Sequence, residues 1–314
     1  MNIAEIVTSR QNDGTRRRLR DAVNNDGNIT VEAIETAAPA FAVTMQIASL
    51  LKKKRIDTVL VHTNKQAIAA LSAKKLAEKS NNGYTIVYQP LRCDETPRNI
   101  PAEIVREVAL WLFEDTAQQQ TYEKIARQSL NAAAILPATT FDDTDTPIAY
   151  QPKTYDNTRP LRLAFIGDIT DYAALRNSVL AIGSLEHADI EYSICGTGKA
   201  RHIMPIVRTA RDDKRHRYHW KGNEYDRNEE IAQADIAIAD QQYVTADQIL
   251  LMKRGVPVLQ AVDHAELAAK LAAVIAQPDT LRQMSQDAID AYRNTYSPLF
   301  HVKQFSKILS DATQ

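Results

Sequence analysis

Cysteine is scarce in this chain, and long apolar runs are missing from it. Only two of the 314 residues are cysteines, Cys93 and Cys195. They lie far apart without the spacing of metal ligands, which argues against a disulfide framework and fits a reducing compartment. No run reaches the roughly 18 apolar residues of a membrane span, and residues 1–7 are neither long nor apolar enough for a secretion signal. We therefore expect a cytoplasmic protein, with peripheral contact at a membrane as the alternative.

The chain also lacks an excess of charge of either sign. Lysine and arginine number 38, and aspartate and glutamate number 39. Because no global field would attract nucleic acid or an acidic membrane, any such binding must be local, and we expect no nucleic-acid partner. Hydrophobic residues make up 44% of the 314 residues. This length and composition suit about two domains, each with its own core.

Glycine occurs at only nine positions, and their spacing argues against a dinucleotide site. Gly196 and Gly198 follow a predicted strand, but the third glycine and the distal acid of the dinucleotide fingerprint are missing. A tight turn from strand to helix is the more common meaning of such a pair. Gly14 precedes a predicted helix, so the amides at Gly14 and Thr15 could cradle a phosphate or a carboxylate. A simple turn at Gly14 is the other interpretation.

Short apolar strands alternate with helices along most of the chain. In the first half, the pattern predicts strands at 2–8, 30–34, 57–62, 84–88 and 133–136, helices at 15–24, 40–53, 66–79 and 116–128, and a helix running into a strand at 102–113. The rhythm restarts with strands at 162–166, 190–195, 218–220 and 236–239 and helices at 172–185, 200–211 and 228–233. Residues 138–160 shift to threonine, aspartate and proline, which is typical of a linker. We expect an α/β protein with two Rossmann-like, doubly wound parallel-sheet domains, residues 1–150 and 151–314.

The ends of the predicted strands carry polar residues that could bind a ligand. In open α/β sheets, ligands collect outside the carboxyl ends of the strands, beside the N-termini of the helices that follow. The polar loop 240–245 lies at such a place, before a helix closed by Gly255 and Pro257. We therefore expect a small anionic ligand at this loop. His62 lies at another strand end, where a hydrogen-bonded structural role is the more common one.

Two basic runs lie on predicted helices. Arg16, Arg17, Arg18 and Arg20 belong to the first, and the second, from Arg208 to Arg217, is offset by two aspartates. Charge runs usually form solvated helix faces. Contact with a ligand or a lipid surface is the alternative for the first run.

Five stretches, taken in order, carry a resemblance to a known family. They are LAFIG at 163–167, SICGTG at 193–198, YHWKG at 218–222, ADIAI at 234–238 and MKRGVPV at 252–258. Together they resemble the donor domain of GT-B glycosyltransferases, particularly family 4, and residues 57–62 and 110–113 are similar to that family's acceptor domain. The resemblance covers nearly the whole chain. It implies a GT-B architecture whose C-terminal helices, at 278–292 and 297–312, cross back to the first domain.

The resemblance also implies an activity. Its members transfer a hexose from a nucleotide sugar to an acceptor, here a small molecule, a lipid or a glycan, with no separate cofactor or metal. The donor-binding positions that it implies are Gly14, Thr15, Gly167, Arg176, Gly196, Lys221 and Thr245. Arg176 is the closest match to the basic pair that holds the diphosphate, and Asp168 stands where a cation is expected.

The family's two glutamates, which are separated by seven intervening residues, are missing. Counting back from Gly255, their positions hold Gln242 and Leu250. Gln242, the one catalytic candidate, can hydrogen-bond a sugar but carries no charge to stabilise an oxocarbenium-like transition state. Leu250 cannot bind the hydroxyls of a ribose. The family's histidine after an acceptor-domain strand is Gln89 here.

Two functions from different classes remain open on the sequence. The first is a hexosyltransferase with an unusual donor, acting in a cleft between two Rossmann-like domains. The second is a catalytically inactive GT-B-like protein that binds a sugar or nucleotide, or serves as the partner of an active transferase. A sugar epimerase or a periplasmic-type binder is a weaker third interpretation.

Overall fold

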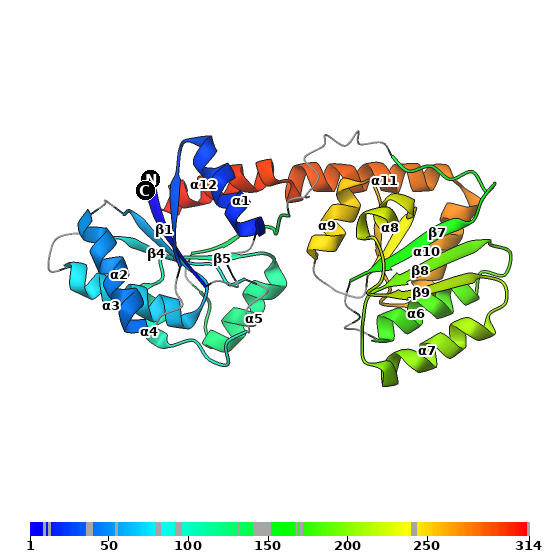
Figure 1. The fold of residues 1–314 in the computed structure, drawn as a ribbon, viewed down its shortest axis with the longest axis horizontal. Coiled ribbons are helices and arrows are strands. Elements are labelled where there is room, and N and C mark those ends of the chain that lie inside the picture. Colours follow the sequence, from blue (N-terminus) through cyan, green and yellow to red (C-terminus); the bar gives the residue numbers. More distant parts are fainter. Residues whose placement is uncertain are drawn as a thin grey trace. The chain divides into compact units, whose positions relative to one another are not determined.

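The computed structural model divides the chain into two compact units. Unit 1 comprises Met1–Phe141 and Pro298–Gln314, and unit 2 comprises Asp142–Ser297. The structure describes residues 1–8, 11, 14–35, 40–53, 56–78, 83–91, 96–130, 132–140, 152–167, 169, 172–239 and 244–312. Each unit is a sheet covered by helices (Figure 1).

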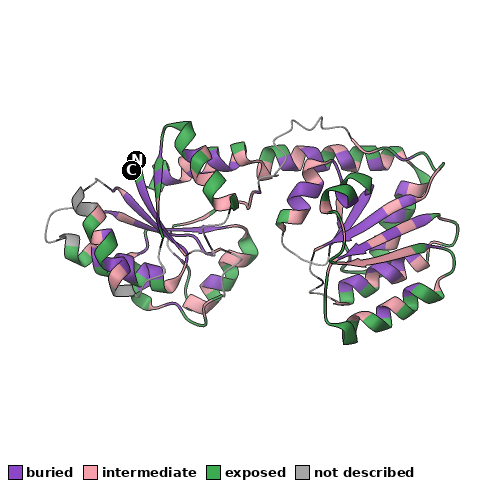
Figure 2. Ribbon diagram, in the orientation of Figure 1, coloured by how far each residue is buried: buried purple, intermediate pink, exposed green. Residues whose placement is uncertain are grey.

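The sheet of unit 1 is entirely parallel. Its strands are β1 (Asn2–Val7), β2 (Thr30–Glu35), β3 (Thr58–Val61), β4 (Thr85–Tyr88), β5 (Leu110–Phe113) and β6 (Ala133–Ile135), in the order β2-β1-β3-β4-β5-β6. Every residue of β3 and β5 is buried, and Figure 2 shows the buried strands between half-exposed helices. Continuous apolar strands of this kind are typical of a parallel sheet covered on both faces.

Six helices cover the sheet in the described part of unit 1. They are α1 (Gly14–Asp26), α2 (Ala40–Lys53), α3 (Asn64–Glu78), α4 (Ala102–Glu107), α5 (Thr116–Ala126) and α12 (Pro298–Ala312). One face packs on α1 and α12, where Val23, Val302 and Phe305 join Ile3 and Leu60 of the strands. The other face packs on the remaining helices. The last helix of the chain is therefore part of the core of unit 1.

The sheet of unit 2 is also parallel. Its strands are β7 (Leu161–Ile166), β8 (Ile190–Cys195), β9 (Arg217–Gly222), β10 (Ile236–Ala239) and β11 (Val258–Gln260), in the order β11-β10-β7-β8-β9. The connections from β7 to β8 and β9 run in one direction across the sheet, and those from β10 to β11 run in the other. The order therefore reverses between β7 and β10, which makes this the topological switch point where doubly wound sheets bind ligands.

The helices of unit 2 lie on both faces of its sheet. They are α6 (Tyr172–Gly183), α7 (Ala200–Asp212), α8 (Arg227–Gln233), α9 (Ala246–Lys253), α10 (His264–Ala276) and α11 (Asp279–Ala291), followed by the π-helical turn η1 (Tyr292–Tyr296). The larger core joins α6, α7 and α10 to one face, and a smaller cluster joins α8 and α9 to the other. Because α8 has only seven residues, it leaves part of its face of the sheet uncovered.

The predicted fold class is confirmed, with two parallel-sheet α/β domains. The segment 102–113 divides, as expected, into helix α4 and strand β5. Gly255 closes α9 with a positive φ of 70°, and Val256 N–H donates to Leu251 O at 2.9 Å, which forms a Schellman motif. Among the helices that the structure describes, none combines the length and the apolar character of a membrane span.

Candidate functional site

Three neighbouring strands of unit 2 end in glycines with positive φ. Gly167 follows β7 with φ 127°, Gly196 follows β8 with φ 150°, and Gly222 ends β9 with φ 55°. The turns are hydrogen-bonded to one another, because Gly167 N–H donates to Cys195 O at 3.0 Å and Gly196 N–H donates to Gly222 O at 2.7 Å. At these three strand ends the edge of the sheet is therefore bordered by glycine backbone, which suits a close approach to a ligand.

Gly198 has a packing role in the same region. A Cβ atom at this glycine would lie 3.0 Å from Ile203 Cδ1 and 3.1 Å from the hydroxyl of Tyr172. That hydroxyl accepts a hydrogen bond from Lys199 N–H at 2.7 Å. The pair Gly196 and Gly198 thus makes a tight strand-to-helix turn, the alternative that the sequence favoured over a dinucleotide fingerprint.

An arginine and an aspartate meet beside these turns. Arg227, the first residue of α8, forms an ion pair with Asp247 in the first turn of α9. The Oδ2 atom of Asp247 lies 3.4 Å from the position that a Cβ on Gly167 would take. Thr245 begins α9 as its N-cap and accepts a hydrogen bond from Gln248 N–H at 3.2 Å. The start of α9, the turn after β7 and a cation therefore come together at the topological switch point.

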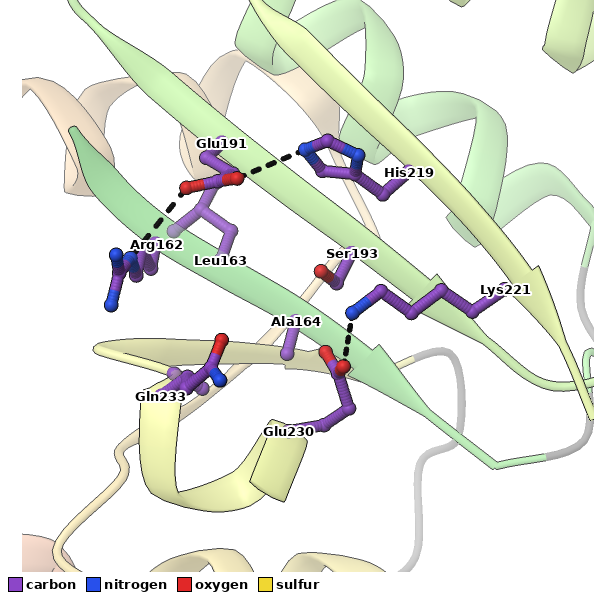
Figure 3. Close-up of a pocket in the computed structure, with 10 residues that line it drawn as sticks. Arg162, Leu163, Ala164, Glu191, Ser193, His219, Lys221, Glu230 and Gln233 are labelled. Atoms are coloured by element: carbon purple, nitrogen blue, oxygen red, sulfur yellow. Dashed lines mark hydrogen bonds and ion pairs between the residues drawn. The ribbon is translucent and has the colours of Figure 1, made fainter. Parts of the chain in front are cut away.

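Lys221 lies in a pocket on the uncovered face of the unit 2 sheet. The pocket, of about 100 Å³, is lined by residues of β7, β8, β9 and α8 (Figure 3). In it the Lys221 ammonium donates a hydrogen bond to Glu230, which raises the pKa of the lysine. Glu191 in the same pocket accepts from His219 Nε2 at 3.0 Å and lies 3.5 Å from Arg162 Nε. Lys221 is thus held by an acid on the face of the sheet.

Cys195 borders the same region, and its side chain is buried. Burial raises the pKa of its thiol to about 12, so the thiolate is not populated at neutral pH. Among the residues that the structure describes, no three histidine, cysteine or carboxylate side chains gather as ligands for a metal ion.

Unit 1 contains a buried charge cluster centred on Glu5, a carboxylate in the middle of the otherwise apolar strand β1. Arg16 donates to its Oε1 atom, Arg20 Nη1 donates to its Oε2 atom at 2.9 Å, and His62 Nε2 lies 3.0 Å from Oε1. His62 Nδ1 lies 2.7 Å from the carbonyl oxygen of Gln89. The side chains of Glu5 and His62 are 1% and 0% exposed. This burial fits the structural role expected for His62.

The cluster keeps its carboxylate charged. Burial raises the pKa of Glu5, but the nearby Arg16 guanidinium and the hydrogen bond from His62 outweigh it and hold the pKa well below its ordinary range. A carboxylate with such a low pKa is a poor general base. Of the first basic run, Arg17 and Arg18 are exposed, as expected for a solvated helix face. Arg16 and Arg20 instead point inward and pair with Glu5.

His301 of α12 lies near this cluster. Its Nδ1 atom is 2.8 Å from Pro137 O, and its buried Nε2 atom has no partner within the described part of the chain. Burial lowers the pKa of His301 to about 4, and the charge of Arg16 acts in the same direction. The imidazole is therefore neutral at pH 7 and donates its Nδ1 proton to Pro137 O.

The remaining predicted residues lie in different surroundings. Gly14 is the first residue of α1, next to Thr15, and a Cβ on it would meet nothing within 4 Å. Arg176 is exposed on α6 and makes no ion pair with any described residue. Leu250 is buried in the apolar cluster of α8 and α9. Gln242 and Asp168 lie outside the described residues.

Sequence reasoning missed Glu5, Arg227 and Asp247. A signal for Glu5 exists, since it interrupts an apolar strand, and Arg16 and Arg20 share one helix face at an i, i+4 spacing. Arg227 and Asp247 begin two helices on the same side of a doubly wound sheet. Their pairing depends on a topology that the local pattern does not encode.

Comparison with known proteins identifies the fold. Neither the protein-family models nor the curated protein sequences contain a match to this chain. Among solved structures, the apo form of the lipopolysaccharide outer core galactosyltransferase WaaB is similar, with a TM-score of 0.69, 12% identity and 99% of each chain covered. HepE from Anabaena in complex with UDP-glucose gives a TM-score of 0.62 at 12% identity, covering 99% of this chain and 100% of the other.

An epimerase is similar as well. The UDP-GlcNAc 2-epimerase of Neisseria meningitidis, bound to UDP-GlcNAc, gives a TM-score of 0.55 at 11% identity, covering 99% of each chain. The chain therefore has the two-domain parallel-sheet fold of GT-B glycosyltransferases over its full length. Because an epimerase also resembles the chain, the fold by itself does not choose between these activities.

Proposed function

We propose that this chain is a glycosyltransferase-like protein of the family 4 type that binds a nucleotide sugar at the carboxyl edge of the unit 2 sheet. The observation that carries the proposal is the row of glycine turns at Gly167, Gly196 and Gly222. Gly167 lies at the switch point, beside the N-terminus of α9, where a diphosphate is favourably bound. Gly196 and Gly222 continue the row along the same edge of the sheet. Similar solved structures hold UDP-glucose and UDP-GlcNAc, which makes uridine nucleotides the first probes.

The proposed reaction is transfer of a hexose to a small, lipid or glycan acceptor. Gly167 and Gly196 would let the nucleotide approach the backbone, Thr245 begins the helix whose amides face the phosphates, and Arg176 would contribute a charge. Gln242 would hydrogen-bond the sugar. Gly14 and Thr15 keep their proposed role within unit 1, where the first amides of α1 would bind an anion. A protein partner and peripheral contact with a membrane belong to the same proposal.

A catalytically inactive nucleotide-sugar binder is the second candidate. The observation that favours it is Leu250, which is buried in an apolar cluster at the position where the family has a ribose-binding glutamate. Leu250 cannot bind the hydroxyls of a ribose, and without a carboxylate at Gln242 the electrostatic stabilisation of an oxocarbenium-like transition state is lost.

Calorimetric titration with UDP, UDP-glucose and UDP-GlcNAc tests the proposal, with ADP as the matched nucleotide control. Micromolar binding of a uridine nucleotide and a rise in thermal stability with ligand concentration are expected. No binding by any nucleotide would refute it. Incubation of the bound sugar nucleotide then separates the candidates, because a transferase releases UDP with an acceptor, an epimerase changes the sugar, and an inactive binder returns the ligand unchanged.

A further inference from the structure

Arg227 is linked to the glycine turn after β7 through its ion-pair partner Asp247, whose carboxylate lies against Gly167. Its backbone position is fixed by Asp226, the N-cap of α8, which accepts hydrogen bonds from Asn228 N–H at 2.9 Å and Glu229 N–H at 3.2 Å. Its guanidinium pairs with Asp247, and its Nε atom is buried without an acceptor among the described residues. A guanidinium offers five donors, so this one retains capacity for an oxyanion.

The Asp247 carboxylate occupies a position that favours an anion. It lies in the first turn of α9, where the partial positive charge of a helix N-terminus favours negative charge. It also lies against Gly167, whose missing side chain lets Oδ2 come within 3.4 Å of the Cβ position. The Arg227 and Asp247 side chains are 42% and 28% exposed, so an incoming ligand can reach both.

We infer that Arg227 is a phosphate-binding residue of this site and that Asp247 is its resident competitor. The inference rests on the proposed function, since it names a phosphate contact of the same nucleotide site. A carboxylate and a phosphate bind a guanidinium through the same pair of parallel hydrogen bonds. A diphosphate at the start of α9 therefore displaces Asp247 from Arg227, and the repulsion between that carboxylate and the phosphate lowers the affinity of the wild-type protein.

Lys221 does not fill this role. It lies on the neighbouring strand β9, but its ammonium is turned to Glu230 in the pocket on the face of the sheet. Its partner Glu230 is buried, so releasing the lysine would leave a buried carboxylate unpaired. Arg227 has the more exposed partner, so a ligand can replace that partner more easily.

The test is a double-mutant cycle read by calorimetry with UDP and, separately, with inorganic pyrophosphate. Asp247→Asn is expected to tighten binding of both probes about tenfold, and Arg227→Gln to weaken it about tenfold. In the variant that carries both substitutions, Asp247→Asn no longer tightens binding, because the guanidinium that would receive the phosphate has been removed. Asp279→Asn, which removes an exposed aspartate from the first turn of α11, is the control for the change in net charge. Asp247→Ser repeats the test with a residue that suits the start of a helix.

Five outcomes decide whether Arg227 binds phosphate. Tighter binding by Asp247→Asn that depends on Arg227 supports the inference. Tighter binding of pyrophosphate by Asp247→Asn, with no preference for UDP over pyrophosphate, supports the inference and refutes the proposed nucleotide site. Binding of UDP that neither substitution changes refutes the inference and leaves the proposed function standing. A gain of the same size with Asp279→Asn, or no binding by any variant, also overturns it.

Discussion

The Glu5 cluster of unit 1 consists of charged side chains that are largely buried against the sheet, whereas the carboxyl edge of the unit 2 sheet has glycine turns beside a partly exposed ion pair. In unit 1, Glu5 joins Arg16, Arg20 and His62, and its side chain is 1% exposed. In unit 2, Gly167, Gly196 and Gly222 lie at the ends of strands, and the Arg227 and Asp247 pair lies beside Gly167. Two sheets of the same class therefore hold their charged residues in different surroundings.

The difference separates residues that hold the fold from residues that are free to bind. A buried carboxylate paired with two arginines costs several kcal/mol to disturb, so the Glu5 cluster acts as a fixed part of unit 1. The Arg227 and Asp247 pair is partly solvated and worth little to stability. Its exchange for a ligand is correspondingly easy, which is why we place the nucleotide at the unit 2 edge.

The largest effect is expected from breaking the cluster of unit 1. Glu5→Gln leaves Arg16 and Arg20 with an uncompensated charge, and we expect the free energy of unfolding of unit 1 to fall by about 3–5 kcal/mol. Urea unfolding measures this in a Trp220→Phe background, where the buried Trp111 of β5 reports on unit 1 alone. Glu103→Gln is the control, because Glu103 pairs with Lys75 on the surface. A Glu5 variant as stable as this control would show that the cluster is not structural.

The fold was largely predictable from the sequence because its signals are local. Apolar strands, the helix closed by Gly255 and the proline that follows each specify a single element through its period or its turn. The Glu5 cluster was not predicted, since Glu5 and His62 are 57 residues apart and meet only through the strand order. The pair of Arg227 and Asp247 depends in the same way on the reversal between β7 and β10.

The second effect concerns Leu250, where the sequence comparison and the structure give opposite expectations. By resemblance, Leu250→Glu restores a ribose-binding carboxylate. In the structure, Leu250 packs with Ala164, Ile166 and Leu251, so the new carboxylate would be buried without a partner and its pKa would rise. We expect the free energy of unfolding of unit 2 to fall by at least as much as in a Leu→Ala substitution in a core, which typically costs about 2–5 kcal/mol.

Thermal unfolding of Leu250→Glu with and without UDP measures this effect, with Leu250→Gln as the uncharged control. A stable Leu250→Glu variant that binds UDP more tightly than Leu250→Gln would place this position at the ligand and favour the transferase over the inactive binder.

The third effect is a dependence of unit 1 stability on pH. The folded pKa of His301 is about 4 against an ordinary 6.5, so the unfolded chain takes up the proton first as the pH falls. The stabilisation by neutral His301 is complete above about pH 6.5 and is lost toward pH 4, amounting to about 3 kcal/mol. Unfolding followed through Trp111 at pH 7 and at pH 4.5 measures it. His301→Gln should flatten this dependence, whereas replacing the exposed His264 with glutamine should not.

The smallest effect is expected from replacing Arg176. It tests whether this side chain contacts a ligand at the carboxyl edge of the unit 2 sheet. Arg176 is exposed on α6 and makes no ion pair with any described residue, so Arg176→Ala should leave the stability of unit 2 unchanged. If the side chain reaches the phosphate as the resemblance implies, the substitution weakens UDP binding by about 1.5–3 kcal/mol, the range for a charge-assisted hydrogen bond. Calorimetry with UDP measures this, and Arg208→Ala on the exposed side of α7 controls for the lost charge. Equal affinities of the two variants would remove Arg176 from the site and leave Arg227 to supply the phosphate contact.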